Sequence, residues 1–152
     1  MRAALIVAPL LVGLAACATS KVPPPQEGTS ATYRSGQVWA FRHRPAESAS
    51  RLTVLRVDAH PQLGTIVHVR IDGMRIRIPQ DPSRPVTMIE HMPFSESALL
   101  ASTTRLVREG TEVPDYSAGY AQWLDALERG NGGIFTISVA EGIDVMERTL
   151  NP

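Results

Sequence analysis

Cysteine is almost absent from this chain of 152 residues, which contains only Cys17. A single cysteine excludes a disulfide within the chain and leaves no cluster of thiols to hold a metal. An excess of one charge is missing too, because 15 basic and 15 acidic residues give a formal net charge of zero. Without a basic excess, the chain lacks the long-range field that favours nucleic acid, so no nucleic-acid partner is expected.

Aromatic residues and long apolar runs are also scarce. Aromatic residues make up 5% of the chain, and the apolar stretch near the N-terminus is shorter than the roughly 20 residues that a membrane-spanning helix needs. With 43% hydrophobic and 20% charged residues, the composition is typical of one ordinary globular domain. It excludes a disordered chain and a protein with several membrane spans.

The N-terminus has the layout of a secretory signal, with Arg2, an apolar stretch and small residues before Cys17. Leu14-Ala15-Ala16-Cys17 resembles the lipobox of bacterial lipoproteins. This resemblance implies cleavage before Cys17 and acylation of that cysteine, which makes the lipid bilayer a partner. Because Ala18 rather than Asp follows, it also implies the outer membrane, with the protein facing the periplasm. The alternative is an ordinary signal peptide beside an unrelated cysteine.

A polar, proline-rich segment from Lys21 to Thr32 follows the cysteine. Such a composition predicts an extended tether rather than part of a core, and folding is expected to begin near Tyr33. The predicted organisation is a signal peptide at 1–16, a lipidated N-terminus and tether at 17–34, and one globular domain at 35–152.

Apolar residues alternate with polar ones in the first half of the folded part, which predicts strands. Asp72-Gly73 separates two alternating runs, and this pair suits the type I′ turn of a two-residue hairpin because both positions need a positive φ. The hairpin would pair Ile71 with Met74. The predicted strands are 38–42, 52–57, 65–71, 74–78 and 86–91, the last of them ended by Pro93.

The hairpin register places a basic quartet on one face of the two strands. The quartet consists of His68, Arg70, Arg75 and Arg77. Like charges that face each other across strands are destabilising, so a compensating group is expected. Acidic residues of the same chain, such as Glu90 or Glu47, are one alternative. The other is a phosphate or carboxylate of a ligand, which the forked guanidinium group suits, and the quartet is therefore the candidate anion- or partner-binding site.

Helical patterns occupy the second half of the chain. One helix runs to Arg129, with Asp115 or Ser117 as its cap and Gly130 as its stop. A capping box, Ser138-Val139-Ala140-Glu141, opens the last helix. The other elements expected here are a short helix at 95–102 with Leu99 and Leu100 inward, and a buried strand at 134–137.

These elements predict an α+β fold, with a twisted antiparallel sheet of four to five strands and about three helices packed on one side. The alternative is a small, curved β-barrel with appended helices.

No catalytic constellation stands out. Glu90, His91 and Ser95 are of the residue types used in nucleophilic hydrolysis, but the chain has no Gly-x-Ser-x-Gly motif. In the alternative interpretation, His91 ends a strand and Ser95 caps the following helix. The histidines are scattered without metal-ligand spacing, and no glycine loop precedes a helix, so neither a metal nor another cofactor is expected.

The sequence favours a membrane-anchored bacterial lipoprotein of the cell envelope with a non-enzymatic periplasmic binding or interaction module. Its partner would be an envelope protein or an anionic envelope component. A small periplasmic hydrolase that uses His91 is the alternative, which leaves enzymatic activity open. A third possibility, a structural spacer, predicts that the chain's own carboxylates pair the whole basic quartet.

Overall fold

The structure is a computed structural model that describes residues 22–152. The predicted signal peptide and Cys17 lie outside the described residues. The described part contains six strands and three helices in a mixed order. The elements are β1 (Gln26–Glu27), β2 (Val38–Phe41), β3 (Arg51–His60), β4 (Gly64–Ile76), β5 (Val86–Ser95), α1 (Glu96–Ser102), β6 (Thr103–Arg108), α2 (Ser117–Glu128) and α3 (Val139–Leu150).

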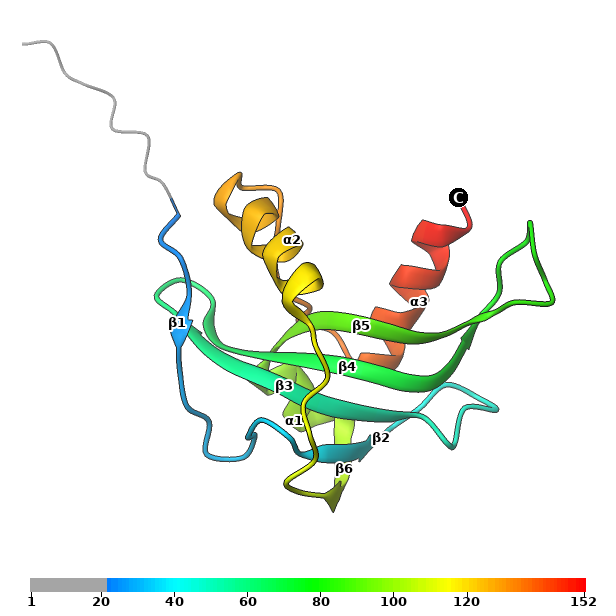
Figure 1. Cartoon of the computed structure of the whole chain (residues 1–152), viewed down its shortest axis with the longest axis horizontal. Coiled ribbons are helices and arrows are strands. Elements are labelled where there is room, and N and C mark those ends of the chain that lie inside the picture. The colour runs from blue at the N-terminus through cyan, green and yellow to red at the C-terminus, as the bar shows by residue number, and fades with distance from the viewer. Residues whose placement is uncertain (1–21) are drawn as a thin grey trace, which may run out of the picture.

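The strands form one open antiparallel sheet in the order β5-β4-β3-β2-β6, with the short β1 paired to β3. The long strands β3, β4 and β5 run side by side, as Figure 1 shows. β5 and β6 lie at opposite edges, so the sheet does not close into a barrel. The predicted α+β fold with a twisted antiparallel sheet and three helices is confirmed.

Apolar residues are buried on both faces of the sheet. Val67 packs in the main core together with Leu99 of α1 and Ile143 of α3. Its neighbour Ile66 packs instead with Trp123 and Leu127 of α2. Successive residues of a strand point to opposite faces, so α1 and α3 cover one face and α2 covers the other. The expected packing of all three helices on one side is therefore wrong for α2.

Asp72-Gly73 does not form the predicted hairpin turn, and this prediction was wrong. β4 continues through both residues, and Asp72 pairs with Arg51 of β3 on one side and with Met88 of β5 on the other. Pairing on two sides outweighs the local turn preference. Gly73 has a φ of +80°, and the backbone of residues 49–50 approaches it closely. The true hairpin partner of β4 is β5, reached through the loop at 77–85.

Pro93 does not end the fifth predicted strand, because β5 continues to Ser95. β5 is an edge strand, where a proline costs no ladder hydrogen bond if its nitrogen faces outward. The carbonyl of Pro93 does face outward and accepts a 2.8 Å hydrogen bond from the N–H of Phe135. Phe135 forms only an isolated bridge, and Ile137 is exposed, so the buried strand predicted at 134–137 is not formed.

The start of α3 and the end of α2 follow the predicted local signals, but α2 begins after Tyr116 without a side-chain cap, so the predicted cap at Asp115 or Ser117 was wrong. α3 opens with the expected capping box of Ser138 and Glu141, and Gly130, with a φ of +73°, follows the end of α2. In α1, Leu99 is fully buried but Leu100 is 51% exposed, because a helix of seven residues turns only one face to the core. Among residues 22–152, no helix is long and apolar enough to span a membrane.

The proline-rich segment is not a free tether from residue 22 onward. Val22 packs against the cluster of Ile66 and Trp123, and Gln26–Glu27 pair with β3 as β1. The carbonyl of Pro23 lies 3.0 Å from Nε2 of His60. The folded part therefore begins about a dozen residues before the predicted boundary at 35, because the open edge of β3 provides a strand partner.

We predict that Gly73→Ala destabilises the protein by about 2–3 kcal/mol, more than Gly64→Ala, which should cost about 1 kcal/mol. Both glycines have a positive φ. A Cβ on residue 73 would also lie 3.1 Å from the carbonyl oxygen of Ala49, whereas nothing lies within 4 Å of one on residue 64. Urea unfolding of the two variants measures the difference. Equal losses would show that the close approach at Gly73 carries no cost.

Candidate functional site

A buried polar cluster lies between the sheet and α2. Its centre is a row of three side chains, Asp58, His68 and His91, which we call the histidine relay. Asp58 and His68 are both 0% exposed, and His91 is half-buried. Charged and imidazole groups are buried at a high cost unless they have partners, so the contacts of this row determine what it can do.

The sheet register brings the relay together. Its members come from the adjacent strands β3, β4 and β5, and His68 pairs with Arg56 on one side and Pro93 on the other. Asp58 and His91 lie two residues from these pairing partners, on the same face of the pleated sheet. This is the face that α2 covers.

Asp58 is held as a carboxylate by three neighbours. Oδ2 accepts a 2.7 Å hydrogen bond from the hydroxyl of Tyr120, and Oδ1 accepts a 2.5 Å hydrogen bond from Nε of Arg56. Nε2 of His68 lies 3.2 Å from Oδ2, as an electrostatic contact that is not aligned as a hydrogen bond. Burial acts to raise the pKa of Asp58, but these three contacts outweigh it and hold the pKa below its usual value.

The tautomer of each histidine follows from this carboxylate. A carboxylate only accepts hydrogen bonds, so it favours a proton on the facing Nε2 of His68. With that proton on Nε2, Nδ1 of His68 can accept a hydrogen bond, and it lies 2.9 Å from Nε2 of His91. This assignment places the His91 proton on Nε2 and its lone pair on Nδ1. Within residues 22–152, Nδ1 of His91 has no hydrogen-bond partner.

Aromatic rings and one glycine complete the surroundings of the relay. The His68 ring centroid lies 4.7 Å from that of Trp123 and 5.1 Å from that of Tyr120, both in α2. This helix can approach His91 only because residue 119 is glycine, since a Cβ there would lie 2.7 Å from the Cβ of His91. Burial and the nearby His68 lower the pKa of His91 to about 4, so its imidazole is neutral near pH 7.

His91 reaches the surface in a shallow groove of about 430 Å³ between β5 and α2. The volume falls within the range of small-molecule sites. The groove residues are Ile89, Glu90, His91, Pro93, Gly119, Gln122, Trp123 and Ala126. Its walls are mostly apolar, and besides His91 the polar side-chain groups among these residues belong to Glu90, Gln122 and the indole N–H of Trp123.

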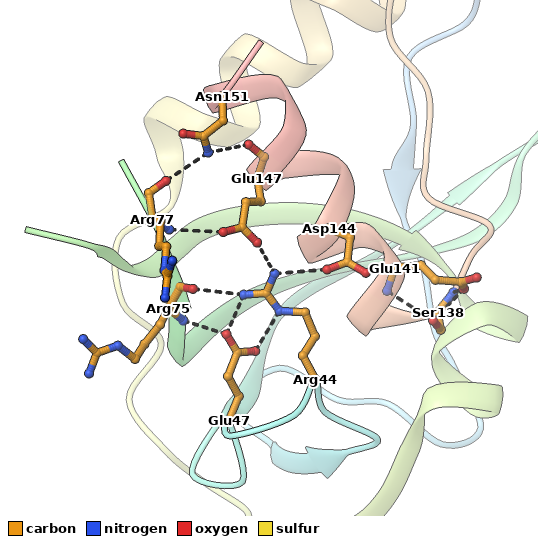
Figure 2. Close-up of polar contacts among 9 residues, drawn as sticks. All are labelled: Arg44, Glu47, Arg75, Arg77, Ser138, Glu141, Asp144, Glu147 and Asn151. Carbon is orange, nitrogen blue, oxygen red and sulfur yellow. Dashed lines mark hydrogen bonds and ion pairs between the residues drawn. The ribbon is translucent and has the colours of Figure 1, made fainter. Parts of the chain in front are cut away.

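A second cluster of charges surrounds Arg44, on the loop between β2 and β3 (Figure 2). Its guanidinium group contacts Glu47 at 2.5 Å, Asp144 at 3.0 Å and Glu147 at 2.5 Å. The hydrogen bonds that Arg44 donates to Glu47 are the main cause that raises the pKa of Arg44, against the effect of burial. This network ties the loop to α3 and carries a formal net charge of −2, because three carboxylates surround one guanidinium group.

The Arg44 network also fixes the end of β4. Glu47 accepts a 2.8 Å hydrogen bond from the backbone N–H of Arg75, and Glu147 accepts one of 3.2 Å from that of Arg77. The side chain of Arg75 extends away from the network in Figure 2. Both arginines are exposed and line a groove of about 710 Å³. Neither guanidinium group has a partner within residues 22–152.

The structure does not keep the basic quartet together, and the predicted shared face was wrong. His68 belongs to the histidine relay, on the face that α2 covers. Arg70 is paired with Asp72, with its Nη2 2.9 Å from Oδ1. Only Arg75 and Arg77 remain as exposed cations beside one groove. Since β4 does not turn at Asp72-Gly73, the expected cross-strand pairs do not exist.

Glu90, His91 and Ser95, which were considered for hydrolysis, do not form one site. Ser95 caps α1, where its hydroxyl accepts a hydrogen bond from the N–H of Ala98, and Glu90 is exposed. His91 alone belongs to the relay. In the described part of the chain, no group of three or more His, Cys, Asp or Glu side chains is placed to hold a metal ion.

Sequence reasoning missed Asp58 and the partners that it gathers. One signal was present, because aspartate is depleted in strands and Asp58 directly follows the predicted strand at 52–57. Tyr120 and Trp123 lie three residues apart on one stripe of α2, and Trp123 is buried. Nothing in the sequence indicated that this stripe would cover two histidines.

No family model matches the chain, and no curated protein or solved structure matches it either. Function is therefore inferred from the geometry of the described residues and from the N-terminal sequence.

We predict that wild-type protein loses about 1–2 kcal/mol more stability than His91→Gln between pH 7 and pH 5. The pKa of His91 is about 4 in the folded protein and about 6.5 in the unfolded chain. The unfolded chain therefore binds more protons in this range, and stability present above pH 6.5 is lost as the pH falls toward 4. Glutamine does not titrate, and its amide can still donate to His68.

Urea unfolding of both proteins across this pH range gives the comparison. The acidic groups are common to both, so their effects cancel. Parallel stability curves would contradict the lowered pKa of His91.

Proposed function

We propose that this chain is a lipid-anchored protein of the bacterial envelope whose folded domain binds an anionic group of an envelope component at a non-catalytic site. The observation that carries the binding proposal is the pair of exposed arginines, Arg75 and Arg77, beside the 710 Å³ groove. The lipobox-like sequence that ends at Cys17 supports the anchor.

The chain's own carboxylates form no ion pair with these two arginines within residues 22–152. The nearest acidic groups, Glu47 and Glu147, are already bound to Arg44 and to backbone N–H groups. Their pKa values lie below the usual range because these contacts outweigh burial. Both carboxylates therefore stay ionised and bound to Arg44 and the backbone N–H groups. The absence of partners for Arg75 and Arg77 within residues 22–152 favours a binding module over a structural spacer.

A phosphate or carboxylate is the ligand chemistry that this arrangement suits. Two guanidinium groups, two residues apart on one strand end, can each form a forked pair of hydrogen bonds to oxygen atoms of an anion. The hydrogen bonds to the backbone of Arg75 and Arg77 hold the strand end in place, so little backbone ordering is required on binding. The ligand is therefore an anionic group on an envelope protein or lipid.

We predict that Cys17→Ser moves the protein from the membrane fraction to the soluble fraction and abolishes its labelling with palmitate. Serine provides no thiol for the diacylglycerol, and without acyl chains the protein loses its stable attachment. Metabolic labelling and fractionation of cells measure both effects. Retention of label and of membrane attachment by the variant would rule out the anchor.

We predict that the double variant Arg75→Glu, Arg77→Glu loses at least tenfold of the captured partner in a pull-down from solubilised membranes. The change reverses both charges at the groove without removing a side-chain contact of the described fold. A control with the same charge change, Arg34→Glu with Arg105→Glu, alters two exposed arginines elsewhere and should keep the partner.

Capture should also weaken with rising salt, because exposed charges are screened. Equal recovery by the wild type and the groove variant would contradict binding at Arg75 and Arg77. Recovery of no partner by the wild type would count against the binding module itself.

A further inference from the structure

The histidine relay contains more linked polar side chains than are needed to satisfy one buried histidine. A core can satisfy one histidine with a carbonyl or a water. Here an ionised carboxylate, a fully buried imidazole and a half-buried imidazole form a row that ends at the 430 Å³ groove. None of these residues takes part in the anion binding proposed above, so the relay needs an explanation of its own.

The row ends at Nδ1 of His91, an atom without a hydrogen-bond partner in the described fold. Nε2 of His91 is committed to His68 at 2.9 Å, while Nδ1 has no partner in residues 22–152. A Cβ on Gly119 would lie 3.7 Å from this Nδ1, and both residues line the groove. Nδ1 of His91 therefore lies beside Gly119 of α2, and both residues belong to the groove wall.

We propose that the groove between β5 and α2 is a hydrolytic site in which Nδ1 of His91 acts as the general base on a water that attacks an uncharged carboxylic ester. A base needs a fixed tautomer and a fixed ring orientation. His68 supplies both through its contact with Nε2, and Asp58 in turn orients His68. His91 is the catalytic residue, and Asp58 and His68 are positioning residues.

The proton and electron balance of the step is simple. Nδ1 takes a proton from water as the water oxygen bonds to the ester carbonyl carbon and the carbonyl π electrons move to its oxygen. When the tetrahedral intermediate collapses, the bond from carbon to the alkoxy oxygen breaks, and the imidazolium gives the proton to the leaving alcohol. The products are a carboxylic acid and an alcohol, with His91 neutral again. No other reactant is required.

The groove favours this class of substrate. Ile89, Pro93 and Ala126 provide an apolar wall for a short acyl chain, and Glu90 disfavours anionic substrates. Gln122 is the one neutral side-chain N–H donor there besides Trp123, whose indole is already bound to the carbonyl of Gly133 at 2.8 Å. The amide of Gln122 is thus the side chain available to stabilise the developing oxyanion.

The test is hydrolysis of p-nitrophenyl acetate, butyrate and octanoate by the full-length protein in detergent micelles. Wild type should exceed the His91→Gln variant by about 10²-fold or more in kcat/KM, which is the usual contribution of a general base. Glutamine keeps a donor to His68, so this variant should remain folded, and circular dichroism checks that it does. The matched control is His43→Gln, which changes an exposed histidine on another loop and should hydrolyse like the wild type.

The pH profile separates a relay from an ordinary surface imidazole. The groups that face His91 are His68 from β4 and, behind it, Asp58 from β3 and Tyr120 from α2. In these surroundings, the rate should reach its plateau well below pH 6.5, the usual midpoint for histidine. Asp58→Asn should lower kcat with little change in KM, because residue 58 does not line the groove, and should move the pH midpoint.

Three results would overturn the proposal. They are no wild-type hydrolysis of any of the three esters above His91→Gln, an equal loss in His43→Gln, and a midpoint near 6.5 in the wild type. The arginine variants of the preceding section do not touch this groove, so the two proposals succeed or fail separately.

Discussion

The buried carboxylate of Asp58 is the constraint around which one face of this protein is organised. An ionised group with no exposed surface is tolerated only if charges and donors compensate for its lost hydration. Arg56 supplies the charge from the same strand, His68 a contact from the next strand, and Tyr120 a hydroxyl from α2. Burial and Asp58 raise the pKa of Tyr120 to about 12, so this donor keeps its proton.

This compensation also explains why α2 packs where it does. The apolar cluster on its face of the sheet is small, so the hydroxyl of Tyr120 and the ring contacts of His68 add much of the specificity of docking. The absence of a side chain on Gly119 allows the helix backbone to approach His91. The position of the helix and the surroundings of the relay are thus linked through Tyr120 and Gly119. The opposite face holds the larger core, where α1 and α3 pack on the central strands.

Features set by neighbouring residues were predictable from the sequence, and features set by distant ones were not. The capping box of α3 and the stop at Gly130 depend on residues within one helical turn, and both predictions are confirmed. Asp72-Gly73 carries a strong local turn signal, yet β4 continues because partner strands lie on both of its sides. The predicted fold class survives this error because an antiparallel sheet results from either hairpin.

The candidate sites were likewise predictable only where they depend on neighbouring residues. Arg75 and Arg77 were identified as candidate ligands, but their separation from His68 and Arg70 follows from the course of β4. The relay could not be predicted, because Asp58, His68 and His91 are joined only by the register of three strands. Its second histidine was considered only beside Glu90 and Ser95, its neighbours in sequence, whereas its real partner is 23 residues away.

The pairing of β1 with β3 has a consequence for how the domain would search for a partner. Because the fold already includes Val22, only the four residues Ala18 to Lys21 separate it from Cys17. Even if fully extended, a linker of this length spans at most about 18 Å. A lipid on Cys17, as proposed, would confine the domain to a thin layer above the leaflet. Encounters would then be governed by lateral diffusion in two dimensions, and the accessible partners would be those whose anionic groups project into that layer.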